Sequence, residues 1–127
     1  MLVLDRKIIS RLQFSLNIIK ELTRQSRIIF NLPIEEPTLV IDDEVKIACY
    51  YAGQGIIAIS DDILDLNSEA KVRQILIHEF CHHIMYYIDD GKSTHGKQFK
   101  ECCKIFGIPA SSSLKIRTKK GEKIKWL

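Results

Sequence analysis

The chain has 127 residues, of which 46% are hydrophobic and 28% charged, with a net charge of +3. This composition fits one globular domain over residues 1–127 and excludes a second large domain or extensive disorder. No apolar run is long enough to span a membrane and no signal peptide is evident, so we expect an intracellular protein with reduced cysteines, neither secreted nor membrane-bound.

The first predicted element is a helix near the start of the chain, with Asp5 as its N-cap. Its apolar residues repeat at helical spacing over about five turns. They are Ile8, Leu12, Leu16, Ile19 and Leu22.

Three short strands are predicted next, at residues 38–41, 46–51 and 56–60, because these segments are rich in β-branched and aromatic residues. The glycine-containing segment 52–55 joins the last two as a hairpin. We expect residues 56–60 to form a sheet edge that can hold an extended peptide by main-chain pairing.

Two further helices are predicted. The first is capped by Asn67 or Ser68, runs to about Asp90 and ends at Gly91. The second is shorter, is capped by Thr94 and stops at residues 107–109. Its apolar face comprises Phe99, Cys102, Cys103 and Phe106.

Positive charge gathers at the end of the sequence. Residues 31–91 hold three Lys or Arg against twelve Asp or Glu, whereas residues 92–127 hold ten against two. The tail at about 111–127 alternates loosely and is predicted to form a basic hairpin turning at Lys120 and Gly121. With Trp126, this basic C-terminal region is a candidate contact for DNA; a solvated basic tail is the alternative.

The strongest chemical signal is His78-Glu79-Phe80-Cys81-His82, an HExxH motif. Residues four apart share one helix face, so His78 and His82 can bind one metal ion. Imidazole nitrogen suits zinc, and a catalytic zinc takes three protein ligands and a water. Glu79 lies beside this pair, where it can act as a base on that water.

A third ligand follows the helix. The chain turns near Gly91 into Ser93-Thr94-His95-Gly96, which can bring His95 back to the metal. The predicted site is therefore one Zn²⁺ per chain held by His78, His82 and His95, with Glu79 as the catalytic residue. An aspartate at 89 or 90 is the competing third ligand.

These motifs resemble the SprT-like metalloprotease family, which includes Spartan. The family has HExxH, a variable connection, and then HG followed two residues later by an aromatic residue; here the second part reads His95-Gly96-Lys97-Gln98-Phe99. The similarity covers roughly residues 46–106. The C-terminal cysteine-rich zinc ribbon of several members is absent from this sequence, which weakens the expectation of DNA recognition more than that of catalysis.

The resemblance implies an α+β, minimal zincin-like metalloprotease core with an N-terminal helix, a small three-stranded sheet, the HExxH helix and a short following helix. It also implies a zinc endopeptidase that hydrolyses peptide bonds with Glu79 as general base and acid. Its substrates would be proteins or peptides, including proteins bound or crosslinked to DNA, as in DNA–protein crosslink repair.

Other hypotheses for the function stay open. The chain could be an inactive metalloprotease-fold module that binds DNA or a protein partner, or a metal-dependent hydrolase of another kind, such as a nuclease. His83 points about 100° away from His82 around the helix, so a polar contact is expected rather than metal ligation. Tyr86 and Tyr87 are expected to pack, with donation to an oxyanion as the alternative.

Overall fold

The structure, a computed structural model, describes residues 5–92, 95–109 and 114–123. Helix α1 spans Arg6–Phe30 and confirms the first predicted helix, although it is longer than the apolar repeat suggested. The Asp5 side chain accepts a hydrogen bond from the Ile8 N–H at 2.9 Å, so it caps the helix as expected. Asn31 ends the helix in the left-handed conformation.

The three predicted strands form one sheet, made of β1 (Thr38–Ile41), β2 (Ala48–Tyr51) and β3 (Ile56–Ile59). The order is β1-β3-β2, with β3 parallel to β1 and antiparallel to β2. The expectation that the third strand is an edge is therefore wrong, because β3 lies in the centre and β2 is an edge. The full burial of Ile57, Ala58 and Ile59 suits a central strand.

The motif lies on helix α3, which spans Glu69–Asp89. Ser68 is its cap, since its hydroxyl accepts from the Lys71 N–H at 3.3 Å, and Asp90 and Gly91 end it with positive φ values. Before it lies a separate helix, α2 (Asp61–Leu66), which was not predicted; the Ser60 hydroxyl caps it.

The following helix, α4, spans Lys97–Ile105 with Gly96 at its N-cap position. It starts later than a cap at Thr94 requires, and Thr94 itself lies outside the described residues. Phe99, Cys102 and Cys103 are buried on its inner face, which confirms the predicted apolar face.

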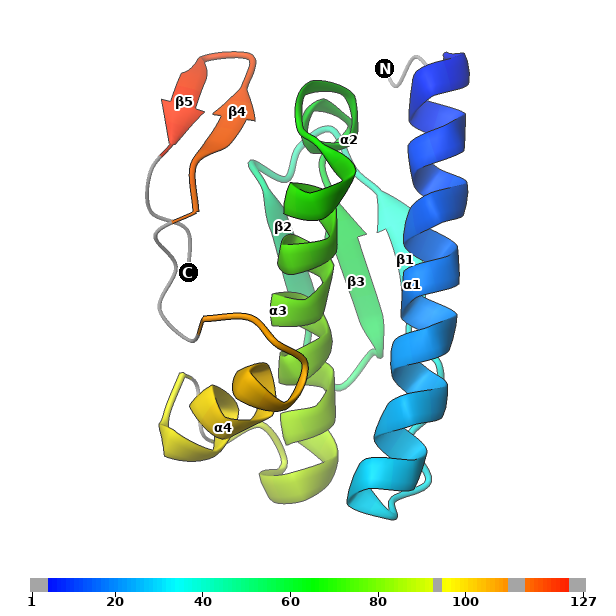
Figure 1. The fold of residues 1–127 in the computed structure, drawn as a ribbon, viewed down its shortest axis with the longest axis vertical. Helices are drawn as coiled ribbons and strands as arrows, with labels where there is room; N and C mark the ends of the chain where they lie inside the picture. The colour runs from blue at the N-terminus through cyan, green and yellow to red at the C-terminus, as the bar shows by residue number, and fades with distance from the viewer. Residues whose placement is uncertain (1–4, 93–94, 110–113, 124–127) are drawn as a thin grey trace.

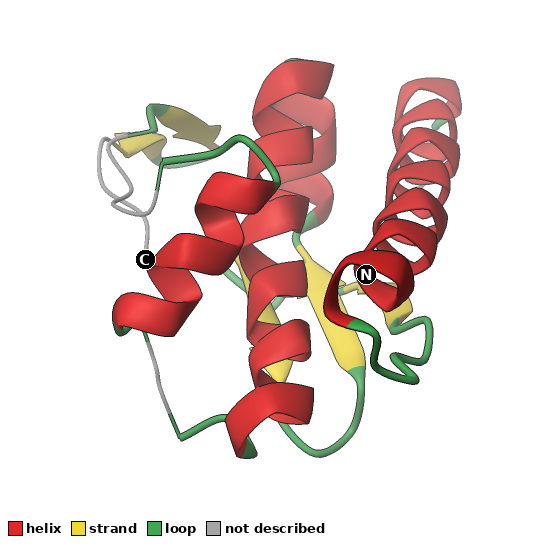
Figure 2. Ribbon diagram, turned by 60° about the horizontal axis from the view of Figure 1, so that its bottom comes forward, coloured by secondary structure: helices red, strands yellow, loops and turns green. Residues whose placement is uncertain are grey.

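The helices α1 and α3 lie side by side on one face of the sheet (Figures 1 and 2). Helix α3 supplies much of the core and is buried along most of its length, which explains its weak amphipathic pattern. Its fully buried side chains include Val72, Ile75, Leu76, Ile77, Phe80 and Ile84. The described helices include none that is long and apolar enough to cross a membrane.

The predicted C-terminal hairpin is also present, as β4 (Ile116–Thr118) and β5 (Gly121–Lys123). Asn67, only 4% exposed, holds it to the domain. The Asn67 side chain accepts from the Arg117 N–H at 2.9 Å and donates to the Arg117 carbonyl oxygen at 2.9 Å. Lys125 and Trp126, part of the predicted DNA-contacting tail, lie outside the described residues.

Candidate metal centre and its cleft

Three histidines converge beside α3. His78 and His82 lie one turn apart on the helix, and His95 comes from the connection before α4. One ring nitrogen from each lies within 4.8 Å of the others, close enough for all three to reach one ion. His95 adopts the left-handed conformation with φ of 59°, an uncommon geometry for a non-glycine residue. The three residues predicted as ligands are thus brought together.

One aromatic ring packs against all three imidazoles. The Phe99 ring stacks on His82, with ring centroids 4.5 Å apart. It also meets His78 at 5.1 Å and His95 at 5.0 Å, in both cases edge to face. Because Phe99 is fully buried, it restricts the orientations available to the three rings.

The electrostatic state of the histidines suits metal binding. Burial, with the neighbouring His82 and His95 rings, lowers the pKa of His78 to about 3. Burial and the nearby His95 lower the pKa of His82 to about 4, and burial also lowers the pKa of His95. All three imidazoles are therefore neutral at pH 7, as ligation requires.

A second observation bears on whether these residues fit a metal. His95 Nε2 is buried and has no hydrogen-bond partner among the described residues. A buried nitrogen without a partner is costly, and a metal ion would satisfy it. Three neutral imidazole nitrogens within 4.8 Å of one another match the donor set of a catalytic zinc site.

Glu79 is next to His78 and is 5% exposed. Burial raises the pKa of its carboxyl to about 8. A carboxyl that titrates near neutrality can both accept and release a proton under working conditions. The residue predicted to be the base thus has the protonation behaviour that this role needs.

Next to the histidine cluster is a cleft of about 290 Å³ between β2 and α3. Glu79, His82 and His95 line it, and Glu79 is the one acidic group in its lining. Most of the other lining residues are small or aromatic. They are Ala48, Cys49, Tyr50, Ala52, Met85, Tyr86 and Gly91.

Some of the neighbouring polar residues line the cleft, and others make hydrogen bonds within the fold. Tyr86 lines the cleft, whereas the Tyr87 hydroxyl accepts from the Glu35 N–H at 3.0 Å. His83 is not among the clustered histidines; it is buried and bonded to Tyr50 and Glu35, which confirms the expected polar contact. Cys81, Cys102 and Cys103 are buried free thiols, as expected for small hydrophobic residues.

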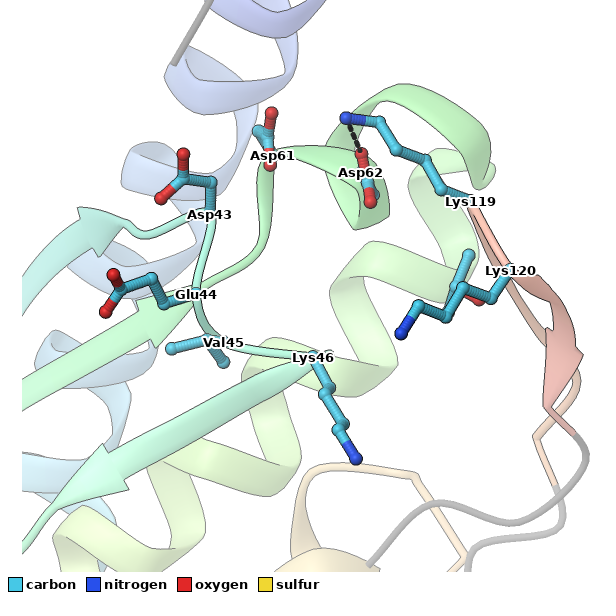
Figure 3. A pocket seen from close by; sticks show the side chains of 9 residues that line it. Asp43, Glu44, Val45, Lys46, Asp61, Asp62, Lys119 and Lys120 are labelled. Carbon is cyan, nitrogen blue, oxygen red and sulfur yellow. Dashed lines mark ion pairs between the residues drawn. The ribbon is translucent and has the colours of Figure 1, made fainter. Parts of the chain in front are cut away.

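A second, larger cleft of about 440 Å³ lies between the β1–β2 loop, α2 and the C-terminal hairpin (Figure 3). Acidic and basic side chains face each other across it, and Lys119 Nζ reaches Asp62 Oδ1 at 3.2 Å. Asp62, followed by Asp61 and Asp43, raises the pKa of Lys119. Lys119 thus balances the negative charge of the nearby carboxylates. Among the described residues, no histidine lines this cleft.

The profile of the SprT-like family matches residues 13–120. The chain belongs to the SprT-like family. No curated protein shows significant similarity to it. Among solved structures, the SprT-like chain is similar to the metallopeptidase zymogen jannalysin of Methanocaldococcus jannaschii. The TM-score is 0.51 at 19% identity, over 71% of this chain and 82% of that one, so this similarity supports a metallopeptidase fold.

Family membership supports a metalloprotease that acts on protein or peptide. The sequence patterns did not identify Tyr50 as a lining residue of this protein's cleft. Strand alternation puts Tyr50 and Ala48 on one face of β2, but only the packing of β2 against α3 makes that face a wall of the cleft.

Proposed function

We propose that this protein is a zinc-dependent endopeptidase. One observation carries the proposal: a buried carboxyl with raised pKa, Glu79, lies next to a cluster of three neutral histidines in a cleft beside an edge strand. Each part has a separate role in peptide hydrolysis, and family membership supports their combination.

His78, His82 and His95 would hold one zinc ion through their ring nitrogens. When bound, the ion supplies Lewis-acid polarisation of the scissile carbonyl and acidifies a water molecule. The neutral state of the histidines, together with the buried Nε2 of His95, supports this assignment.

Glu79 would move the protons. Its carboxylate accepts a proton from the attacking water, and the resulting carboxylic acid donates that proton to the nitrogen of the leaving amine. A pKa near 8 in the absence of metal, caused by burial, places both protonation states within reach at neutral pH. A bound cation would favour the carboxylate, which is the form that begins the cycle.

Strand β2 would hold the substrate. Ser60 N–H donates to the Ile47 carbonyl oxygen at 2.9 Å, which puts Ala48 and Tyr50 at positions that are not hydrogen-bonded to β3. Their backbone N–H and C=O groups therefore point to the free edge, where an extended peptide can pair with them. Main-chain pairing is indifferent to side chains and suits broad specificity.

We extend the proposal to proteins bound or crosslinked to DNA. Lys97, Lys100 and Lys104 are exposed at helical spacing on α4, the helix that follows His95. A polyanion lying along this row would hold an attached protein near the cleft. Replacing the three lysines by glutamine should abolish any stimulation of cleavage by single-stranded DNA while leaving cleavage without DNA intact.

The first experiment measures zinc content and casein cleavage. Wild type should carry about one zinc per chain and cleave. His78→Ala and His95→Ala should lose both zinc and activity, whereas Glu79→Gln should keep zinc and lose cleavage.

Other results would redirect the proposal. Full zinc content in His95→Ala would point to another third ligand. Folded, zinc-loaded wild type that cleaves no protein would favour an inactive module that binds DNA or a protein.

A further inference from the structure

His83 follows His82 on α3 but is not part of the cleft lining. Its ring is 3% exposed and both nitrogens are engaged. Nδ1 lies 2.8 Å from the Tyr50 hydroxyl on β2, and Nε2 lies 2.7 Å from the Glu35 carbonyl oxygen before β1. His83 therefore ties three segments that are far apart in the sequence.

The donors and acceptors in this chain of hydrogen bonds follow from its last member. A carbonyl oxygen only accepts, so His83 Nε2 must carry the proton. In a neutral imidazole Nδ1 is then an acceptor, so the Tyr50 hydroxyl donates to it. Burial raises the pKa of Tyr50 to about 12, which keeps that hydroxyl protonated.

The backbone of Glu35 is hydrogen-bonded to two side chains of α3. Its N–H donates to the Tyr87 hydroxyl at 3.0 Å, while its carbonyl oxygen accepts from His83. The rings of Tyr50, Phe80 and Tyr87 surround the imidazole at centroid distances of 5.3, 5.6 and 5.3 Å. These contacts leave the imidazole little freedom to rotate away from Tyr50.

Tyr50 joins the two walls of the cleft. Its backbone groups face the free edge of β2, and its side chain crosses to α3. Helix α3 carries His78, Glu79 and His82, so a hydrogen bond to His83 sets where the substrate-binding edge lies relative to these groups.

We infer that Tyr50 and His83 are a positioning pair, which holds the substrate-binding edge of β2 in register with the metal-binding helix. This inference rests on the proposed function and deepens it. Neither residue touches the reacting atoms in this role; both act through the placement of β2.

Two variants remove the link. Tyr50→Phe deletes the donor, and His83→Gln can still donate to the Glu35 carbonyl but loses the acceptor for Tyr50. His83→Asn is the converse, because its side-chain oxygen can replace Nδ1. Tyr87→Phe is the matched control, since it deletes a hydroxyl that is bonded to the backbone of the same residue, Glu35, but not to β2.

The first readout is binding of a labelled, unstructured casein peptide by zinc-loaded protein carrying Glu79→Gln, which prevents cleavage. Adding Tyr50→Phe or His83→Gln should each raise the Kd roughly three- to tenfold, as loss of one hydrogen bond predicts. Combining them should add little further loss. His83→Asn should bind more tightly than His83→Gln, and Tyr87→Phe should bind as the parent does.

The second readout is hydrogen exchange of the Cys49 and Tyr51 amides, which pair with β3 and need no substrate. Exchange should be faster in Tyr50→Phe and His83→Gln than in Tyr87→Phe. This readout decides the matter if the parent binds no peptide, a result that would count against the proposed function alone. Unchanged Kd and exchange in Tyr50→Phe, or equal losses in Tyr87→Phe, would overturn the inference.

Discussion

The ring of Phe99 stacks on the ring of His82 with an interplanar angle of 27°. This contact links α4 to α3 at the candidate metal centre, and it involves an apolar side chain rather than a polar neighbour. The orientation of an imidazole determines where its nitrogen lone pair points. Phe99 is therefore expected to influence metal affinity without approaching the metal as a ligand.

Phe99→Leu should lower zinc affinity about tenfold, as loss of support around metal ligands commonly does. Phe106→Leu is a suitable control, because Phe106 ends the same helix and packs against Phe80 at 6.5 Å. Competition with a chromogenic chelator measures both affinities. Equal losses in the two variants would mean that Phe99 acts only through general packing.

Glu79→Gln should stabilise the metal-free protein in a pH-dependent way. Burial raises the folded pKa of Glu79 to about 8 from its ordinary value of 4.5. Below pH 4.5 the carboxyl is protonated in both states and costs nothing. As pH rises to 8, the unfolded chain releases this proton before the folded chain does, so wild-type stability falls relative to the variant.

Thermal unfolding of the metal-free proteins measures this effect. The Tm of Glu79→Gln should exceed that of wild type by at least about 4 °C at pH 8. The two Tm values should converge near pH 4.5. A difference that stays constant across this range would show that ionisation of Glu79 is not its cause.

Asn67→Ala should release the C-terminal hairpin. It removes both side-chain hydrogen bonds to the Arg117 backbone, which are partly buried, a loss of about 2 kcal/mol in the free energy of unfolding. Lys119→Met breaks only the ion pair between the exposed Lys119 and Asp62 and should lower the free energy of unfolding far less. Urea denaturation compares them, and similar losses would contradict the anchoring role of Asn67.

Ala48→Pro should weaken peptide cleavage while the protein stays folded. The Ala48 N–H points to the free edge of β2, so proline removes a donor available to substrate but no bond to β3. Cys49→Pro removes an N–H that pairs with β3 and should destabilise the sheet. KM and Tm together separate these outcomes; normal cleavage by folded Ala48→Pro would exclude pairing at this position.

Local signals predicted most elements of this fold. Asp5, the repeat of apolar residues after it, and the glycine-containing turn at 52–55 are short-range features, and each matches the structure. Helix α2 was not predicted because a six-residue helix is too short to show a helical repeat of apolar residues. Ser60, its cap, also continues the predicted strand at 56–60, so the sequence does not mark it as a helix start.

The order of the strands could not be read from local patterns. Residues 56–59 pair with two strands, one of which precedes them by a long connection, so their central position depends on long-range contacts. His78 and His82 were predictable because HExxH spans about one helix turn, and His95 because the chain turns just after that helix ends. The contact of Tyr50 with His83 spans 33 positions and has no local signature.

The strand order also bears on how the chain acquires its shape during synthesis. Strands β1 and β2 leave the ribosome before β3, yet each pairs with β3 and not with the other. The nascent sheet can therefore form only after residue 59 has emerged, and the helix carrying HExxH emerges later still. The edge that would receive substrate is thus synthesised before the residues that would cleave it.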